Sequence, residues 1–320
     1  MEILNFSHIG KMFKHTHVFI WIGFFILAGA SSCSTLFKRR GTEPQQNSAT
    51  APTSAPTGTP TVLGPPEPFG PSMPQAFGPI QSQIRPVILV FGPGLASGFA
   101  AVGVIRALHE NKIPIGAIYA AEAGALVGAL YALDGNINHF EFQLLKYKAS
   151  IFDVKRSLID GLLNKGPSSG GDFQNELKKS FGQRDISSTK IPLRIALHIQ
   201  ESNVELILDQ GAITNAVRAS LASPKVFTPG KFNGSDAIAA EKSGSLLVDQ
   251  AKALGSGPVL AVDTEIFDAS GADLVVKPNF SDLNELDFDQ ETEFAFRGKK
   301  AALDVMSQLR QQVGLGAVEQ

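Results

Sequence analysis

Cysteine is nearly absent from this sequence, since Cys33 is the only one among 320 residues. A disulfide needs two cysteines, so no internal disulfide is possible. The apolar fraction of 43% is sufficient for a packed core of ordinary size. An excess of charge of one sign is also lacking, because 28 basic residues face 30 acidic ones. Without a basic stripe, the sequence predicts no nucleic-acid partner.

A long hydrophobic run is missing as well. The apolar run at residues 18–30 (VFIWIGFFILAGA) is shorter than the ~20 residues that a membrane-spanning helix needs. Lys11 and Lys14 precede this run, and small residues lead from it to Cys33. A basic region, a short apolar region and small residues before a cleavage site form a secretory signal. With cysteine as the first mature residue, the segment resembles a bacterial lipoprotein signal. We therefore expect a signal peptide at residues 1–32 and a membrane anchor on lipidated Cys33.

Alternatives stay open at this end of the chain. In one alternative, the apolar run is an uncleaved membrane anchor. In another, translation starts at Met12 rather than Met1.

Residues 33–84 are rich in Pro, Ser, Thr, Gly and Gln, with few apolar side chains. Such a segment cannot bury enough surface to offset its ordering entropy, so it is predicted to be a disordered tether. Ser34 favours, by resemblance to enterobacterial lipoproteins, the outer membrane of a bacterial cell envelope.

The folded domain is predicted at residues 85–320, where strand patterns alternate with helix patterns. Alternation of this kind favours an α/β fold with a mainly parallel sheet. The expected strands are at 86–91, 115–120, 191–199, 203–208, 258–263 and 272–277, and the expected helices are at 97–111, 122–130, 212–220 and 297–312.

One turn in this pattern has the layout of a nucleophile elbow. The segment 115–130 runs from an apolar strand into a helix of small residues, and the turn between them reads small-x-Glu-x-small. In an elbow, a strained strand-to-helix turn exposes one side chain, and small neighbours leave room for it. Ala120 and Gly124 are the small neighbours here, and Glu122 is the central residue. A carboxylate thus stands where hydrolases carry a hydroxyl.

Together, these segments resemble the patatin-like phospholipases, especially their bacterial members. Segment 89–130 has the family's glycine-rich loop, helix, Pro-Ile strand and elbow in order, and the segments 211–224 and 248–263 resemble its Ser-x-Pro turn and its late helix-strand unit. The resemblance covers nearly all of residues 87–310. It implies a three-layer patatin-like fold, with helices on both faces of the sheet. It also implies a lipid acyl hydrolase that uses a serine-aspartate dyad and needs no cofactor or metal.

The family's catalytic groups are altered at each place that the resemblance identifies. Glu122 occupies the position of the serine nucleophile, and Ala239 that of the aspartate base, in a motif that reads Ala-Ala-Glu. Asp236 is an alternative, displaced base. In the family, the oxyanion loop supplies backbone N–H donors. Pro93 has no N–H group to donate, and Leu95 restricts the backbone dihedral angles that a glycine would allow. The remnant of this loop consists of Gly92, Pro93, Gly94, Leu95 and Gly98, and Ser97 replaces the family's arginine.

Other polar residues receive structural interpretations. His109, His139 and His198 have no metal-ligand spacing, so a hydrolytic or metal-binding cluster with Glu122 is the less favoured alternative. Asp249 and Asp263 are candidate catalytic acids, but the family resemblance places them at a helix start and a strand end, where aspartate caps or binds backbone donors, and this structural role is favoured. The acidic segment 285–293 is expected to be a solvated loop and helix start. Glu122 itself is predicted to accept hydrogen bonds near a helix N-terminus and so to fill the old oxyanion site.

These observations favour a membrane-anchored patatin-like protein without esterase activity, which binds a lipid, an acyl chain or a protein partner at the cell envelope. Two alternatives stay open. The first is an active lipid acyl hydrolase with rearranged groups, in which Glu122 serves as the base for a water molecule. The second is a structural or oligomerisation module.

Overall fold

A computed structural model describes residues 84–152, 167–264 and 269–316 of this protein. The chain divides into the units Met1–Pro74 and Gln75–Gln320, and the described residues all belong to the second. The expected signal peptide, Cys33 and nearly the whole expected tether therefore lie outside the described residues. Within the described ranges, none of the helices is both long and apolar enough to cross a membrane.

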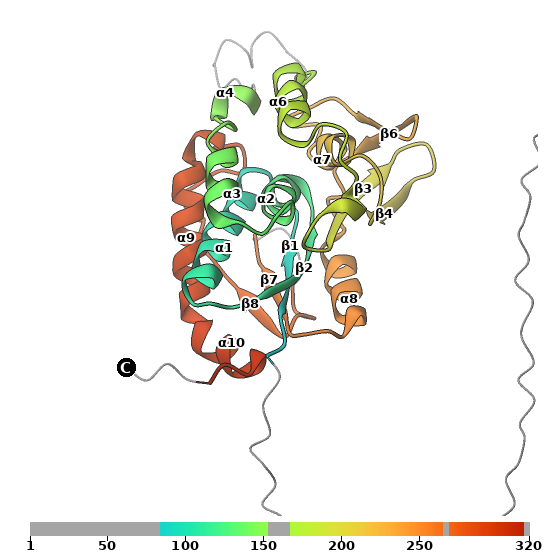
Figure 1. The fold of residues 1–320 in the computed structure, drawn as a ribbon. Coiled ribbons are helices and arrows are strands. Elements are labelled where there is room, and N and C mark those ends of the chain that lie inside the picture. The colour runs from blue at the N-terminus through green and yellow to red at the C-terminus, as the bar shows by residue number, and fades with distance from the viewer. Residues whose placement is uncertain (1–83, 153–166, 265–268, 317–320) are drawn as a thin grey trace, which may run out of the picture. The chain divides into compact units, whose positions relative to one another are not determined.

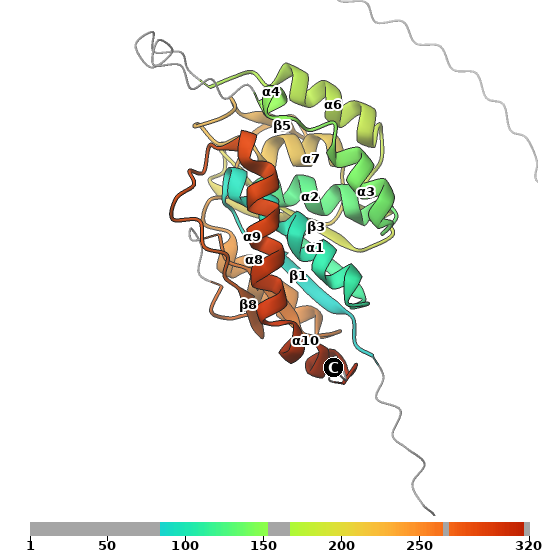
Figure 2. The ribbon, with the colours of Figure 1, turned by 90° about the vertical axis from the view of Figure 1, so that its left-hand side faces the viewer.

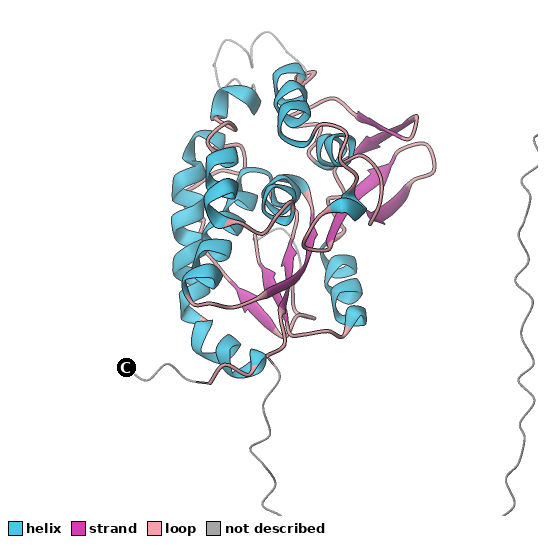
Figure 3. Cartoon of the chain, in the orientation of Figure 1, coloured by secondary structure: helices cyan, strands magenta, loops and turns pink. Residues whose placement is uncertain are grey.

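A mostly parallel sheet forms the centre of the domain (Figures 1 and 3). Its strands follow the order β5-β6-β3-β2-β1-β7-β8, and β4 pairs with β3 outside this path. Pairing is parallel from β3 through β2, β1 and β7 to β8, and antiparallel among β3, β4, β5 and β6. The strands are β1 Val87–Phe91, β2 Ile115–Ala120, β3 Leu193–Ile199, β4 Val204–Leu208, β5 Gly230–Phe232, β6 Ser235–Ile238, β7 Val259–Val262 and β8 Leu274–Val276.

Helices cover both faces of this sheet. Figure 1 shows α1, α2, α3 and α9 on one side of the parallel strands and α8 on the other. The helices are α1 Ala100–Glu110, α2 Glu122–Ala132, α3 Ile137–Leu144, α4 Ala149–Phe152, α6 Gly171–Phe181, α7 Ile213–Ser220, α8 Gly244–Leu254, α9 Glu291–Asp304 and α10 Met306–Val313, with short 3₁₀ segments at η1 Leu95–Phe99, η2 Ile186–Ser188 and η3 Phe288–Gln290.

Strand β1 explains why two apolar layers form. All five of its side chains are buried, and alternate side chains of a strand point to opposite faces. Val87, Leu89 and Phe91 belong to the larger core, under α1, α2 and α9. Ile88 and Val90 belong to the smaller core, which the apolar face of α8 covers. A continuous apolar run is what a strand buried on both faces requires, and the predicted three-layer α/β fold is confirmed.

Glycines let α1 and α9 approach closely. A Cβ atom on Gly103 would lie 1.8 Å from the carbonyl oxygen of Ala295, and one on Gly298 would lie 2.2 Å from that of Ala100. Both distances are far inside van der Waals contact, so neither position admits a side chain without moving a helix. Figure 2 shows the two helices side by side.

Three predictions about the C-terminal half were wrong. The expected single helix at 297–312 is two helices, because α9 starts earlier, at Glu291, and the chain turns at Val305 before α10. This turn lets buried apolar residues of α10 pack under the start of β1, where the Arg85 N–H donates a hydrogen bond to the Val313 carbonyl at 3.0 Å.

The other two wrong predictions concern aspartates. Asp249 lies inside α8 rather than at its start. Asp287 is buried rather than solvated, while Asp263 follows β7 directly, as expected.

Candidate functional site

The elbow predicted from the sequence is present between β2 and α2. Strand β2 ends at Ala120, Ala121 is extended, and α2 begins at Glu122. The backbone of Glu122 has a φ of 49°, in the left-handed region that residues other than glycine rarely adopt. Such conformations cluster where the surrounding structure serves a function. The Glu122 residue, however, is only 3% exposed, so the turn does not present its side chain to solvent as the elbow pattern predicts.

The Glu122 carboxylate is held by the loop that follows β1. Its Oε2 atom accepts a hydrogen bond from the Gly94 N–H at 2.7 Å and another from the Leu95 N–H at 2.5 Å. Two backbone donors therefore converge on one oxygen, as in an oxyanion site. Glu122 was expected to accept hydrogen bonds from the free N–H groups at its helix N-terminus, but its donors lie in the loop after β1.

Burial dominates the electrostatics of Glu122. It raises the pKa of this carboxyl group, because the charged form is poorly solvated there. The hydrogen bonds from Leu95 and Gly94 act in the opposite direction, and the negative charges of Glu241 and Glu285 raise the pKa further. The net effect is an increase. Glu122 thus binds a proton more readily than an exposed glutamate.

Two hydroxyl groups fix the shape of the donor loop. Ser97 Oγ donates to the Gly94 carbonyl at 2.6 Å, and the Thr264 hydroxyl donates to the Pro93 carbonyl. Leu95 adopts a φ of 45°, which its side chain disfavours, and yet its N–H points at the Glu122 carboxylate. The leucine therefore does not remove a donor from this loop, contrary to what its restricted backbone suggested. Thr264 is part of the site that the sequence did not reveal.

Small residues are needed where this loop meets the elbow. A Cβ atom on Gly98 would lie 2.7 Å from the backbone nitrogen of Gly124, and one on Gly124 would lie 2.7 Å from Phe91 Cβ. Ala120, the other small neighbour, is fully buried at the end of β2. Gly92 directly follows β1 and is also buried. The close approach of η1 and α2 brings the Gly94 and Leu95 N–H groups within reach of Glu122.

Ser220 contacts the backbone of the elbow. It was not among the predicted site residues. Its hydroxyl accepts the Glu122 N–H at 2.9 Å and donates to the Ala196 carbonyl at 2.7 Å. The side chain is fully buried at the end of α7. In the sequence, only the resemblance to the family's Ser-x-Pro turn drew attention to the segment that contains Ser220. That resemblance predicted a turn and not a contact with the elbow.

Ala239, the expected position of the base, directly follows β6, and its methyl side chain cannot accept a proton. This alanine is buried, and its N–H bonds the Ala222 carbonyl at 3.3 Å. The negative charge of Glu241, the last residue of the Ala-Ala-Glu motif, contributes to the raised pKa of Glu122. Asp236, the alternative base, lies on the β5–β6 hairpin in an ion pair with Lys231 at 2.7 Å.

The histidines occupy separate places. His109 is exposed on α1, and His198 lies in β3. On α3, a ring nitrogen of His139 lies 2.5 Å from an Asp134 oxygen and the other lies 2.8 Å from Gln143 Nε2. In the ranges that the structure describes, no three His, Cys, Asp or Glu side chains gather as metal ligands would.

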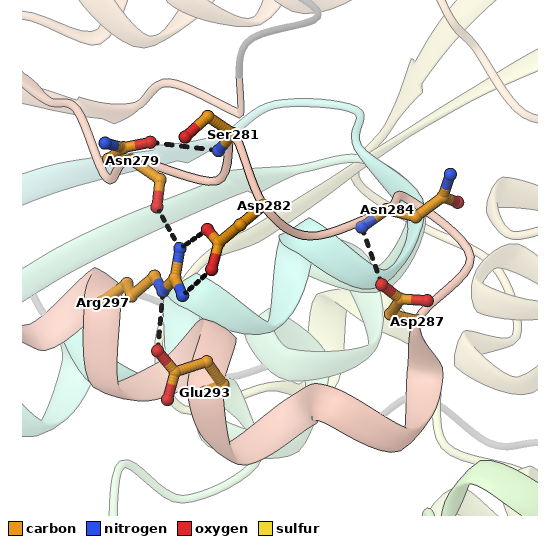
Figure 4. Close-up of polar contacts among 7 residues, drawn as sticks. All are labelled: Asn279, Ser281, Asp282, Asn284, Asp287, Glu293 and Arg297. Atoms are coloured by element: carbon orange, nitrogen blue, oxygen red, sulfur yellow. Dashed lines mark hydrogen bonds and ion pairs between the residues drawn. The ribbon is translucent and has the colours of Figure 1, made fainter.

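A second polar centre fastens the loop before α9 (Figure 4). Arg297 donates to both carboxylate oxygens of Asp282, to Glu293 at 2.7 Å and to the Asn279 carbonyl at 2.9 Å. The Arg297 guanidinium lowers the pKa of Asp282 to about 2 by these hydrogen bonds. A surface pocket of about 450 Å³ opens beside this cluster. Because the guanidinium is already shared by two carboxylates, we interpret the cluster as a structural clamp.

Comparison with known proteins gives a family. The family model for patatin-like phospholipases matches residues 89–249, which is half of the chain. Lysophospholipase nte1 of Aspergillus niger is 31% identical over 186 residues, which are 58% of this chain and 12% of that protein. Lysophospholipase NTE1 of Candida glabrata is 31% identical over 177 residues, with coverages of 55% and 10%. The chain thus matches only about a tenth of the length of these curated relatives.

Two solved structures are also similar. The type III effector protein ExoU is 14% identical, with a TM-score of 0.38, over 73% of this chain and 54% of that chain. VipD from Legionella pneumophila is 16% identical, with a TM-score of 0.31, over 56% of this chain and 49% of that chain.

Proposed function

Since the chain belongs to the patatin-like phospholipase family, we propose that it is a member without ester hydrolase activity, which binds a lipid, an acyl chain or a protein partner at the bacterial cell envelope. One observation carries this proposal. The Glu122 carboxylate occupies the point at which the N–H groups of Gly94 and Leu95 converge. In an active family member, that point is where negative charge would develop on the substrate.

The carboxylate opposes hydrolysis in two ways. It accepts the hydrogen bonds of the Gly94 and Leu95 N–H groups, so an ester oxygen would have to displace the Glu122 carboxylate before these groups could stabilise it. It also replaces the hydroxyl that would attack the ester. A carboxylate can be a nucleophile in other hydrolases, but the acyl anhydride that Glu122 would form is a poor intermediate for ester cleavage.

The absence of a base at Ala239 supports the same proposal. A methyl group cannot accept a proton, so even a serine at position 122 would lack its partner of the family's dyad. Loss of one group is compatible with a variant mechanism. Loss of both the nucleophile and the base on an intact scaffold favours a change from catalysis to binding.

An active enzyme with rearranged groups is the alternative, and the raised pKa of Glu122 favours it. A general base works best when its pKa is close to the ambient pH. In this alternative, Glu122 activates a water molecule that attacks the ester. The alternative requires Glu122 to leave the Gly94 and Leu95 donors during turnover, because the ester oxygen needs them.

Anchoring at the envelope is proposed from the lipoprotein-like signal before Cys33. Expression of the full chain in a Gram-negative bacterium with an alkyne-labelled palmitate would test it. We expect lipid labelling of the wild type in the membrane fraction and none of Cys33→Ala. Equal labelling of both proteins, or a soluble wild type, would contradict the anchor.

Restoration of the dyad tests the loss of activity. We expect Glu122→Ser with Ala239→Asp to hydrolyse p-nitrophenyl butyrate and lysophosphatidylcholine, while the wild type and the single variant Glu122→Ser stay at the background rate. The single variant is the matched control, because it frees the same two donors without supplying a base. Hydrolysis by the wild type that Glu122→Ala abolishes would favour the alternative.

Lipid extraction of the purified wild type, followed by mass spectrometry, distinguishes binding from a structural module. A lipid or fatty acid that copurifies in a stoichiometric amount supports the proposed binding. If none copurifies and none binds when added, a structural or oligomerisation role gains support.

A further inference from the structure

Strand β4 lies at an open edge of the sheet. Among the strands that the structure describes, β4 pairs with β3 alone, so alternate backbone N–H and C=O groups along its other side have no partner strand there. Figure 1 shows the β3–β4 hairpin on the opposite side of the domain from α9. The edge is also apolar, because Val204 is 44% exposed and Leu206 is 37% exposed. An unpaired apolar edge is a template for another strand.

The two ends of the sheet, β5 and β8, are protected against such pairing. Each of these strands has only three residues. β5 carries Lys231, which forms an ion pair with Asp236, and β8 is followed directly by Lys277 and Pro278. Short strands, lysine and proline are means by which sheets prevent edge pairing. β4 has five residues, Val-Glu-Leu-Ile-Leu, and therefore has none of these protections.

The rest of the domain holds β4 in an extended conformation. All five of its residues pair with residues 195–199 of β3 in one antiparallel register. Ile207 packs against the smaller core, and Leu208 packs against the larger core. The backbone of β4 is thus ordered before a partner strand arrives, which lowers the entropic cost of pairing.

We propose that β4 pairs with β4 of a second copy of this chain, antiparallel about a two-fold axis, and so joins two sheets into one. An axis perpendicular to the sheet leaves each face on its own side, so it must centre on a residue. In this dimer, the axis centres on Leu206, which lies opposite Leu206 of the second copy. Val204 then lies opposite Leu208, and Glu205 opposite Ile207.

Charge selects this register among those that pair most of the strand. A register centred on Glu205 places two copies of that carboxylate opposite each other, and one centred on Ile207 places Glu205 opposite Asp209. Like charges directly opposite each other destabilise a pair of strands. With Leu206 at the centre, no two carboxylates are opposite within residues 203–209, and the alternate apolar side chains of β4 meet on one face. The pairing does not involve the Glu122 elbow, so it holds whether or not the protein hydrolyses esters.

Analytical ultracentrifugation of the full chain tests the pairing. We expect a reversible dimer of the wild type. Leu206→Lys should raise the dissociation constant of the dimer at least about tenfold, because it removes two leucines from the interface and places two ammonium groups opposite each other. Leu303→Lys is the matched control, since Leu303 lies on α9 and is 46% exposed. This control should dimerise like the wild type, and circular dichroism should show that both variants are folded.

Disulfide cross-linking tests the register. Cys33→Ala removes the native cysteine from the chain. In this background, Leu206→Cys places two thiols across the axis, where opposite Cα atoms are about 4.5–5.5 Å apart and can be bridged. Val204→Cys is the matched control, because it is exposed on the same face. Its two copies lie four residues apart along the strands, or about 13 Å, which is too far for a disulfide.

Each outcome bears on the proposal. A wild-type dimer that Leu206→Lys weakens, and that Leu206→Cys cross-links, supports the pairing of β4 with itself. A wild type that sediments as a monomer, or a dimer that Leu206→Lys leaves unchanged, would overturn it. Cross-linking of Val204→Cys in preference to Leu206→Cys would overturn the register and with it the proposed interface.

Discussion

Ser220 gives the sharpest test of how the elbow is held in place. Its hydroxyl is fully buried and accepts the Glu122 N–H while it donates to the Ala196 carbonyl. Ser220→Ala removes one oxygen atom and leaves two buried backbone groups without this partner. Each such group costs about 1–3 kcal/mol, so we expect the free energy of unfolding to fall by about 2–6 kcal/mol.

Ser243→Ala is the matched control for this prediction. Ser243 is also fully buried, but its hydroxyl makes one bond, to the Ala240 carbonyl at 2.8 Å. That carbonyl still accepts the Ser243 N–H at 3.1 Å after the substitution. We therefore expect a loss of only about 0.5–1.5 kcal/mol. Urea denaturation followed by circular dichroism measures both losses, and a Ser220→Ala loss no larger than the control's would refute the reasoning.

Three further predictions follow from packing and charge. Gly298→Ala should lower the free energy of unfolding by about 1–3 kcal/mol or more in urea denaturation, because the new methyl group meets the Ala100 carbonyl. The raised pKa of Glu122 predicts that the contribution of this residue to stability is fully present below about pH 4 and is lost as the pH rises through the folded-state pKa, whereas Glu122→Gln should lack this loss in thermal melts across pH. The pKa of Asp282, lowered to about 2 by Arg297, predicts stability that is present above about pH 4 and lost as the pH falls through about 2, and Asp282→Asn should lose less of its stability on acidification.

The sequence predicted the parallel half of the fold well. β1 and β2 are continuous apolar runs, and burial on both faces of a sheet demands such runs. The antiparallel hairpin β5–β6 was missed, because strands of three and four residues are too short to show a period. The break at Val305 was missed for another reason. No proline or glycine marks it, and it follows from the packing of α10 under β1.

The candidate site was predicted in part. The elbow and its small residues followed from the spacing around Glu122, and the carboxylate was expected to accept backbone hydrogen bonds. The source of those donors did not follow, because segments 92–98 and 120–124 come together only through the pairing of β1 with β2. Ser220 and Thr264 reach the site from distant elements for the same kind of reason. The assignments of Glu122 and Ala239 as former catalytic positions stay predictions.

The rate of ester hydrolysis by the purified wild-type chain tests the central claim most directly. With Glu122 on the Gly94 and Leu95 donors, we expect release of p-nitrophenol and of fatty acid from lysophosphatidylcholine at the rate of buffer alone, and the same rate for Glu122→Ala. Turnover by the wild type above that rate, together with its loss in Glu122→Ala, would contradict the account.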